Sequence, residues 1–293
     1  MYGDSMICNL CPRHCNAQRN ENNARGFCKL NDKMKVARIA PHLWEEPCIS
    51  GKNGCGAVFF SGCTLKCVYC QNFEISHDNK GKYISPKELS EKLKELENMG
   101  VHTIEFVSAT QYVPKIIETL DIYKPNVPLI YNSSGYESTE TLRKLEGYID
   151  VYLPDFKYGD NELAKNLSNC TSYVEITTAA INEMVRQHPA ATFDDNGIIT
   201  SGVIVRHLIL PKHTKNSIAV LNIIKENFSD NVLLSLMGQY TPFGNIENFP
   251  ELARKITPRE YNKVLDKLIE LDIDGFSQEL ESADKSYIPT WDF

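Results

Sequence analysis

Hydrophobic residues after position 56 fall into short continuous runs, which are separated by longer segments with helical spacing. Six runs predict strands buried on both faces, as is typical of a parallel sheet covered by helices on each side. These runs are 57–60, 102–107, 128–132, 149–153, 203–210 and 232–236. The segments between them are long enough for helices. The pattern therefore predicts parallel strands joined by right-handed crossovers, in an open doubly wound sheet or in a barrel.

Two of the predicted helices have clear start signals. Ser85-Pro86-Lys87-Glu88 is a capping box with proline at the first helical position, and Thr257-Pro258-Arg259-Glu260 repeats that arrangement. Weaker helical spacing covers 111–121, 137–146, 160–168, 171–188 and 214–228. Both architectures place their chemistry at the carboxyl ends of the strands, so residues that follow a strand are the first candidates for a site.

Residues 1–50 lack this alternation and contain several cysteines. The sequence therefore predicts a cysteine-rich N-terminal metal-binding extension over 1–50. A barrel-like unit with a C-terminal helix and tail is predicted over 51–293. One large domain of this kind is compatible with 293 residues.

Composition and charge exclude some classes of partner. The formal net charge is −7, and lysine and arginine are scattered along the chain, so no nucleic-acid partner is expected. No run reaches the ~18 apolar residues of a membrane span, and the first residues (MYGDSMI) lack the pattern of a secretory signal. We therefore expect a cytoplasmic protein with no membrane partner.

Ten cysteines are present, nine of them within the first 70 positions. Cys63, Cys67 and Cys70 directly follow the first predicted strand with C-x3-C-x2-C spacing. Thiolates are the usual ligands of iron–sulfur clusters, and three of them would leave the fourth iron of a cube open. The alternatives are a zinc knuckle, which would need a fourth ligand, or plain buried thiols.

The segment CTLKCVYC resembles the cluster loop of the radical S-adenosylmethionine (SAM) enzymes. The surrounding text, HLWEEPCISGKNG and VFFSGCTLKCVYCQNFEIS, is similar to an uncharacterised branch near pyruvate formate-lyase-activating enzyme. The resemblance implies a partial (β/α)6 barrel and a [4Fe-4S] cluster on Cys63, Cys67 and Cys70. It also implies that SAM chelates the open iron, that one electron cleaves SAM, and that the resulting 5′-deoxyadenosyl radical abstracts a hydrogen atom.

The resemblance extends to residues near the cysteines and after the second and third strands. It implies that Tyr69 packs against the adenine of SAM, although Tyr69 could also be an ordinary core residue, and that Asn72 contacts the ribose. The family's Gly-Gly-Glu-like segment is here Ser108-Ala109-Thr110-Gln111, which lacks the carboxylate. The amino group of SAM would then meet backbone carbonyls and the hydroxyls of Ser108 or Thr110. Asn132 and Ser133 offer polar groups at the barrel mouth, where a turn would use the same residue types.

Three further positions come from the later strands. Asp155 and Lys157 resemble the Asp-x-Lys of the activating enzymes, which implies contacts with ribose hydroxyls and the methionyl carboxylate; a salt bridge alone is the other interpretation. Arg206 interrupts a buried strand, where a charge is costly unless it is paired, and matches an arginine near the cofactor. Its neighbour His207 is expected to pack. Gln239 lies where the family has a histidine beside the ribose.

Cys8, Cys11, Cys15 and Cys28 supply four thiols, suited to one closed tetrahedral site. They predict either structural zinc or an auxiliary iron–sulfur cluster, and His14 could replace one thiol. Cys48 and Cys55 could be additional ligands or plain thiols, and no role is assigned to Cys170.

The first functional hypothesis is a radical SAM enzyme that abstracts hydrogen from a glycyl or other residue of a protein or peptide. The same chemistry on a small metabolite is the second hypothesis. The third is a non-catalytic iron–sulfur electron-transfer protein, in which Cys48 or Cys55 would close the cluster. A flavodoxin or ferredoxin-type reductant is the expected electron donor.

Overall fold

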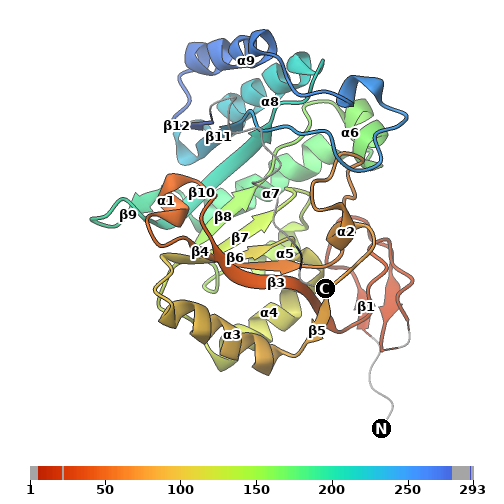
Figure 1. Cartoon of the computed structure of the whole chain (residues 1–293), viewed down its shortest axis with the longest axis vertical. Helices are drawn as coiled ribbons and strands as arrows, with labels where there is room; N and C mark the ends of the chain where they lie inside the picture. Colours follow the sequence, from red (N-terminus) through yellow and green to blue (C-terminus); the bar gives the residue numbers. More distant parts are fainter. Residues whose placement is uncertain (1–5, 22, 279–290, 292–293) are drawn as a thin grey trace.

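The six predicted strands are confirmed as the parallel centre of one open sheet in a computed structural model, which describes residues 6–21, 23–278 and 291 (Figure 1). They are β4 (Cys55–Phe60), β6 (Thr103–Val107), β7 (Leu129–Ser133), β8 (Val151–Pro154), β10 (Ile199–Leu208) and β11 (Leu233–Met237). They pair side by side in this order, and every pair is parallel. Strand order therefore follows chain order, as in a partial barrel that has not closed.

Shorter or antiparallel strands extend the sheet on both sides and were not predicted. β3 (Met34–His42) pairs antiparallel with β4, and β5 (Lys82–Ile84) pairs with β3. At the other edge, β12 (Gly275–Ser277) runs parallel to β11. The remaining strands are β1 (Met6–Cys8), β2 (Ala17–Arg19) and β9 (Thr192–Phe193).

β3 lies within the predicted N-terminal extension, yet it is hydrogen-bonded into the main sheet. The division of the chain at residue 50 stays a prediction. Of the predicted C-terminal tail, 279–290 and 292–293 lie outside the described residues.

Helices occupy the predicted gaps. Both capping boxes are confirmed, at Ser85 and at Thr257, and each of these residues receives the backbone N–H three positions on. The predicted helix over 137–146 is shorter than expected. The α-helices are α1 (Pro47–Ser50), α2 (Phe73–Ser76), α3 (Pro86–Asn98), α4 (Val113–Ile122), α5 (Thr139–Arg143), α6 (Asn161–Ser168), α7 (Tyr173–Gln187), α8 (Thr214–Asn227) and α9 (Pro258–Leu271). Short 3-10 turns are η1 (Thr110–Tyr112), η2 (Ser229–Asn231) and η3 (Pro250–Leu252).

Side chains on alternate positions of each strand belong to two separate cores. On β4, Val58 and Phe60 pack with the helices, whereas Ala57 and Phe59 join the smaller core on the other face of the sheet. Trp291 packs edge-on against Phe59 in this smaller core, with 5.4 Å between ring centroids. The alternation means that polar residues inserted among the inward-facing positions will meet inside the partial barrel.

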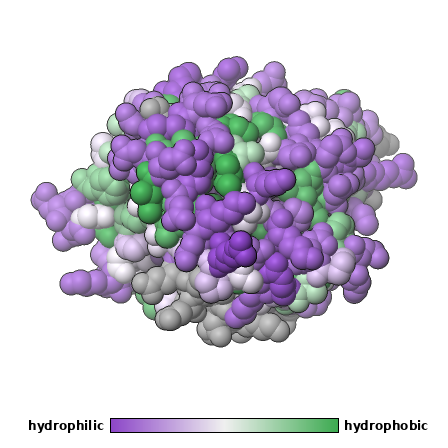
Figure 2. All heavy atoms as spheres, turned by 90° about the horizontal axis from the view of Figure 1, so that it is seen from above, coloured by the Kyte–Doolittle hydropathy of each residue, from purple (hydrophilic) through white to green (hydrophobic). Residues whose placement is uncertain are grey.

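Hydrophilic side chains cover most of the face seen from above, and apolar atoms show in small separate areas (Figure 2). Within the described residues, we find no helix with the length and apolar character that a membrane crossing requires.

Candidate functional site

The cysteine loop and the carboxyl ends of the parallel strands enclose a cavity of about 210 Å3. Most of the predicted site residues line it, although they come from four strand ends and the cysteine loop. They are Cys63, Cys67, Tyr69, Cys70, Asn72, Ser108, Asn132, Ser133, Asp155, Lys157 and Arg206. We call this space the cysteine cavity.

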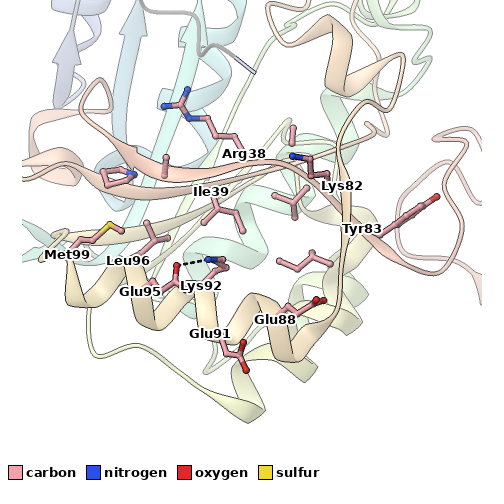
Figure 3. Close-up of a pocket in the computed structure, with 15 residues that line it drawn as sticks. Arg38, Ile39, Lys82, Tyr83, Glu88, Glu91, Lys92, Glu95, Leu96 and Met99 are labelled. Carbon is pink, nitrogen blue, oxygen red and sulfur yellow. Dashed lines mark hydrogen bonds and ion pairs between the residues drawn. The ribbon is translucent and has the colours of Figure 1, made fainter. Parts of the chain in front are cut away.

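A larger hollow of about 630 Å3 lies between β3 and α3 (Figure 3). Its rim carries Arg38 and Lys82 from the strands, and Glu91, Lys92 and Glu95 from the helix. No cysteine and no predicted site residue is among the residues that line it. The chemistry of the sequence therefore points to the cysteine cavity.

The loop after β4 is shaped around its sulfur atoms. The backbone N–H groups of Leu65 and Lys66 lie 3.3 Å and 3.4 Å from the Cys63 sulfur, which accepts from both. This geometry requires a left-handed backbone at Lys66, where φ is 57°. The Ser76 hydroxyl donates to the Cys70 sulfur over 3.3 Å. Hydrogen bonds that converge on sulfur favour the thiolate form that binds metal.

Burial has the opposite effect on these thiols. It raises the pKa of Cys70 to about 12, since a buried thiolate without a counter-ion is poorly solvated. A metal that replaces the protons would supply the missing positive charge, so loading with iron and release of protons are coupled.

Three thiols, and no fourth cysteine, are among the residues that line the cavity. In the described part of the chain, no three Cys, His, Asp or Glu side chains stand close enough to hold a single metal ion. An iron–sulfur cube takes one thiolate per iron, so its ligands stand further apart than those of a single ion. The residues present therefore fit a cluster with three protein ligands.

Asp155 and Lys157 form an ion pair at the cavity wall, with 2.6 Å between carboxylate and ammonium. They follow β8 at alternate positions, and their side chains are only 23% and 18% exposed. Burial is the largest single influence and lowers the pKa of Lys157, but the charge of Asp155 and of the neighbouring acidic groups of Cys67 and Tyr69 together outweigh it, and the pKa is raised well above its ordinary value. The cavity thus offers a fixed positive and a fixed negative group, suited to a zwitterion.

Arg206 also reaches the cavity, and its charge is paired. Its Nε and Nη2 atoms donate to the carboxylate of Glu46, at 2.8 Å and 2.5 Å, and Nη2 also donates to Glu45. Both glutamates are in the segment between β3 and α1. In the described ranges these hydrogen bonds use only Nε and Nη2, and no residue accepts one from Nη1. The Nη1 group is therefore available to a ligand.

A buried glutamate that sequence reasoning missed lies beside Arg206. Glu105 on β6 is fully buried and accepts from the Asn132 amide over 2.6 Å. Burial and the nearby Glu45 raise the pKa of Glu105 to about 8. The sequence did contain a signal for Glu105. It is an ionisable residue inside the apolar run 102–107, and a charge in a buried strand is costly unless it is paired, as for Arg206.

Thr110 and Gln239 do not reach the cysteine cavity. The Thr110 hydroxyl instead donates to buried Glu137 over 2.5 Å, and neither residue lines the cavity. Ser108 does line it, with a left-handed backbone at φ 57°, and Gln111 fixes this turn by donating to the Ser108 carbonyl over 2.7 Å. Of this replacement segment, only Ser108 faces the space where a ligand would lie.

Tyr69 and Asn72 flank the last cysteine of the loop and both line the cavity. Tyr69 is 6% exposed, and its hydroxyl is 2.8 Å from the hydroxyl of Tyr158. Asn72 is the N-cap residue of α2 but makes no capping hydrogen bond with its side chain. His207 faces away from the cavity, as expected, and its Nδ1 atom lies 2.7 Å from the Phe156 carbonyl.

The four N-terminal cysteines meet in a second, much smaller pocket of about 10 Å3. It is lined by Cys8, Cys11, Cys15 and Cys28 together with Thr64 of the cysteine loop. Burial raises the pKa of the Cys28 thiol, and the neighbouring thiols of Cys8 and Cys15 raise it further. His14 does not line this pocket, and Cys48 and Cys55 line neither cysteine site.

Gly135 holds the backbone that carries Asp155. Its φ is 73°, and a Cβ there would lie 2.8 Å from Thr177 Cγ2 and deep inside the van der Waals distance of the Asp155 carbonyl. We expect Gly135→Ala to lower the free energy of unfolding by about 1–3 kcal/mol and to displace Asp155. Urea unfolding measures the loss. Gly147→Ala is the control, since φ there is 82° but nothing lies within 4 Å; equal losses in the two variants would contradict the prediction.

Comparison with known proteins agrees with this geometry. The radical SAM superfamily model matches residues 57–241. The uncharacterized protein MJ0674 of Methanocaldococcus jannaschii is 29% identical over 277 residues, which cover 91% of this chain and 75% of that protein.

Solved structures resemble the chain in fold at low identity. A radical SAM methyltransferase from Sphaerobacter thermophilus has a TM-score of 0.53 and 12% identity, covering 76% of this chain and 65% of that one. SuiB of Streptococcus suis, solved with the precursor peptide SuiA, has a TM-score of 0.50 and 11% identity, covering 76% and 48%. The chain thus spans less than two thirds of the length of each.

The superfamily match begins inside β4, contains the three cysteines, and ends after β11, so it includes every strand that contributes to the cysteine cavity. It also extends over well more than half of the chain. This protein therefore belongs to the radical SAM superfamily, and membership implies a [4Fe-4S] cluster, S-adenosylmethionine and enzymatic radical chemistry.

Proposed function

We propose that this protein cleaves SAM reductively and abstracts a hydrogen atom from a glycyl or other residue of a protein or peptide. The observation that carries the proposal is the composition of the cysteine cavity. It combines Cys63, Cys67 and Cys70, without a fourth cysteine in its lining, with the Asp155–Lys157 pair. When bound, the cluster would supply the single electron that cleaves SAM into methionine and a 5′-deoxyadenosyl radical.

The chain's own residues have the task of binding and orienting SAM. Lys157 is suited to the methionyl carboxylate, and Asp155 to the ribose hydroxyls or the amino group. The Nη1 atom of Arg206 is available as a further donor, because the hydrogen bonds to Glu45 and Glu46 use its Nε and Nη2 atoms. Tyr69, Asn72, Ser108, Asn132 and Ser133 complete the proposed set, since all of them line the same cavity.

The electron carrier without turnover is the weaker proposal. It needs a fourth thiol to close the cluster. The two candidates, Cys48 and Cys55, are buried in the smaller core, outside the cysteine cavity.

The choice of a protein or peptide substrate rests on the resemblance of the cysteine loop and of Asp155-Phe156-Lys157 to the activating enzymes. The existence of a peptide-bound neighbour, SuiB, is compatible with it. A flavodoxin or ferredoxin-type reductant and a cytoplasmic location complete the proposal.

We further propose a metal at Cys8, Cys11, Cys15 and Cys28, either zinc or a second iron–sulfur cluster. All four thiols line one small pocket, which supports the proposal. Within the described residues they do not stand close enough to hold a single ion, so zinc would require the thiols to move closer together. Metal analysis of a Cys63→Ala, Cys67→Ala, Cys70→Ala triple variant distinguishes the two, because only the N-terminal site then remains. Zinc without iron would exclude a second cluster.

The test of the function uses the anaerobic protein reconstituted with iron and sulfide, to which SAM and dithionite are added. We expect 5′-deoxyadenosine, and none from Cys67→Ala.

A second experiment identifies the substrate class. The reaction is repeated with an extract of cells that naturally produce this protein and that were grown in fully deuterated medium, after the extract has been separated into a macromolecular and a small-molecule fraction. Deuterium in 5′-deoxyadenosine from the macromolecular fraction alone supports a protein or peptide. Transfer from the small-molecule fraction alone would overturn the substrate class, and no product from fully loaded protein would overturn the chemistry.

A further inference from the structure

The N-terminal cysteine segment extends one side chain into the loop of the other cysteine site. Arg13 lies between Cys11 and Cys15. Its guanidinium donates to the carbonyl of Thr64 over 2.9 Å, to that of Ser168 over 3.1 Å and to that of Asn169 over 2.5 Å. A longer contact of 3.5 Å reaches the Leu65 carbonyl. One residue therefore joins three segments that are far apart in sequence.

Aromatic rings fix the position of this guanidinium. Its central carbon lies 3.9 Å from the ring centroid of Phe27 and 5.2 Å from that of Tyr136. Phe27 directly precedes Cys28, and Arg13 and Phe27 both line the four-cysteine pocket. Stacking and forked hydrogen bonding together are properties of arginine that lysine cannot reproduce.

The receiving side is the support of the Cys63–Cys70 loop. The Val68 N–H donates to the Leu167 carbonyl at the end of α6, over 2.9 Å. The Ser168 hydroxyl is 2.5 Å from that of Tyr158, which in turn bonds Tyr69 beside Cys70. The loop thus rests on the C-terminus of α6, where unpaired carbonyls attract a cation. Arg13 satisfies two of these carbonyls and one from the loop itself.

We propose that Arg13 is a positioning residue, through which the metal-loaded four-cysteine site holds the loop of Cys63, Cys67 and Cys70 in the geometry its cluster requires. The proposal rests on the proposed function for the identity of that cluster. It needs no contact between the two metals, because the coupling runs through the guanidinium and the carbonyls it binds. Metal bound to Cys11 and Cys15 would fix the short backbone segment between them, and this would fix the orientation of the Arg13 side chain.

The first measurement is hydrogen exchange of the full chain as isolated, in the wild type and in Arg13→Gln, Arg13→Lys and Cys11→Ser/Cys15→Ser. We expect amides of 64–68 to exchange about tenfold faster or more in all three variants, since a charge-assisted hydrogen bond contributes at least that factor. Arg186→Gln is the matched control. Arg186 is also held by several hydrogen bonds, to Glu146 and Glu183, but it lies on α7.

The second measurement is the EPR spectrum of the reduced cluster in reconstituted protein, with iron content recorded in parallel. A changed spectrum in Arg13→Lys, at wild-type iron content and thermal stability, supports positioning beyond a general effect on folding. If exchange in 64–68 and the spectrum are both unchanged in Arg13→Lys and in Arg13→Gln, the proposal is wrong. If Arg13→Gln fails to fold, Arg13→Lys alone decides. Faster exchange in a protein that never cleaves SAM would retain Arg13 as a positioning residue and overturn only the proposed function.

Discussion

Replacement of Cys63, Cys67 or Cys70 by serine, one at a time, is expected to reduce the formation of 5′-deoxyadenosine to the level of protein without iron. Each thiolate holds one iron, and serine at any of the three positions would leave the cube with two protein sulfurs. All three side chains line the cysteine cavity, and no other cysteine is among its lining residues. A neighbouring thiol is therefore not placed to replace the missing ligand. Product analysis and iron content after anaerobic reconstitution measure the effect.

Cys48→Ala and Cys55→Ala are the controls, and they also test the closed-cluster alternative. Both thiols are buried in the smaller core, 5% and 0% exposed. We expect both variants to keep their iron and their product yield. Loss of iron from either one would mean that a fourth protein thiol binds the cluster, which contradicts an open iron and with it the cleavage of SAM.

The parallel strands and main helices could be predicted from the sequence because burial on both faces leaves a continuous apolar run that needs no tertiary information. The strands that were missed lack that signal. β5 and β12 have three residues each, and they exist because a neighbouring strand offers a free edge. β3 is longer, but only its pairing with β4 distinguishes it from the cysteine-rich segment around it.

The limits of the site prediction are of the same kind. Spacing alone predicted that Cys63, Cys67 and Cys70 would act together, and the rule that a buried charge needs a partner applied correctly to Arg206. The rule could not say where the partner lies, since Glu46 is 160 positions away in the chain. Thr110 was expected beside a ligand, but its hydroxyl is used by Glu137, a contact that depends on how the turns after β6 and β7 meet.

The Arg206–Glu46 pair leads to the second large expected effect. Glu46→Ala would leave the guanidinium of Arg206 inside the protein with Glu45 as its remaining carboxylate partner. Breaking a buried ion pair from one side costs about 3–5 kcal/mol, because the other charge stays desolvated. We expect a loss of this size in the free energy of unfolding by urea. Glu95→Ala is the control. It removes an exposed pair with Lys92 and is expected to cost about 0–1 kcal/mol.

The dependence on pH gives an independent check. Burial by itself would raise the pKa of Glu46, but the charge and hydrogen bonds of Arg206 outweigh it and hold the pKa below the ordinary 4.5. A lowered pKa in the folded state means that the stabilisation is present above pH 4.5 and is lost as the pH falls through the folded-state pKa. The difference in the free energy of unfolding between Glu46→Ala and the wild type should therefore become smaller in acid. A difference that is constant from neutral pH to acid would show that the ion pair is not its cause.

A triple variant separates stability from ligand binding. In Glu45→Gln/Glu46→Leu/Arg206→Met the charges of all three paired side chains are removed together, and neutral replacements of a buried ion pair commonly recover most of the lost stability. If Arg206 serves only to balance Glu45 and Glu46, this variant should bind SAM as the wild type does, in equilibrium binding to reconstituted protein. Because the Nη1 atom of Arg206 is left over at the cavity wall, we expect instead that stability returns and SAM affinity does not. Recovery of both would assign Arg206 to the fold alone and leave Lys157 as the cation that orients the carboxylate of SAM.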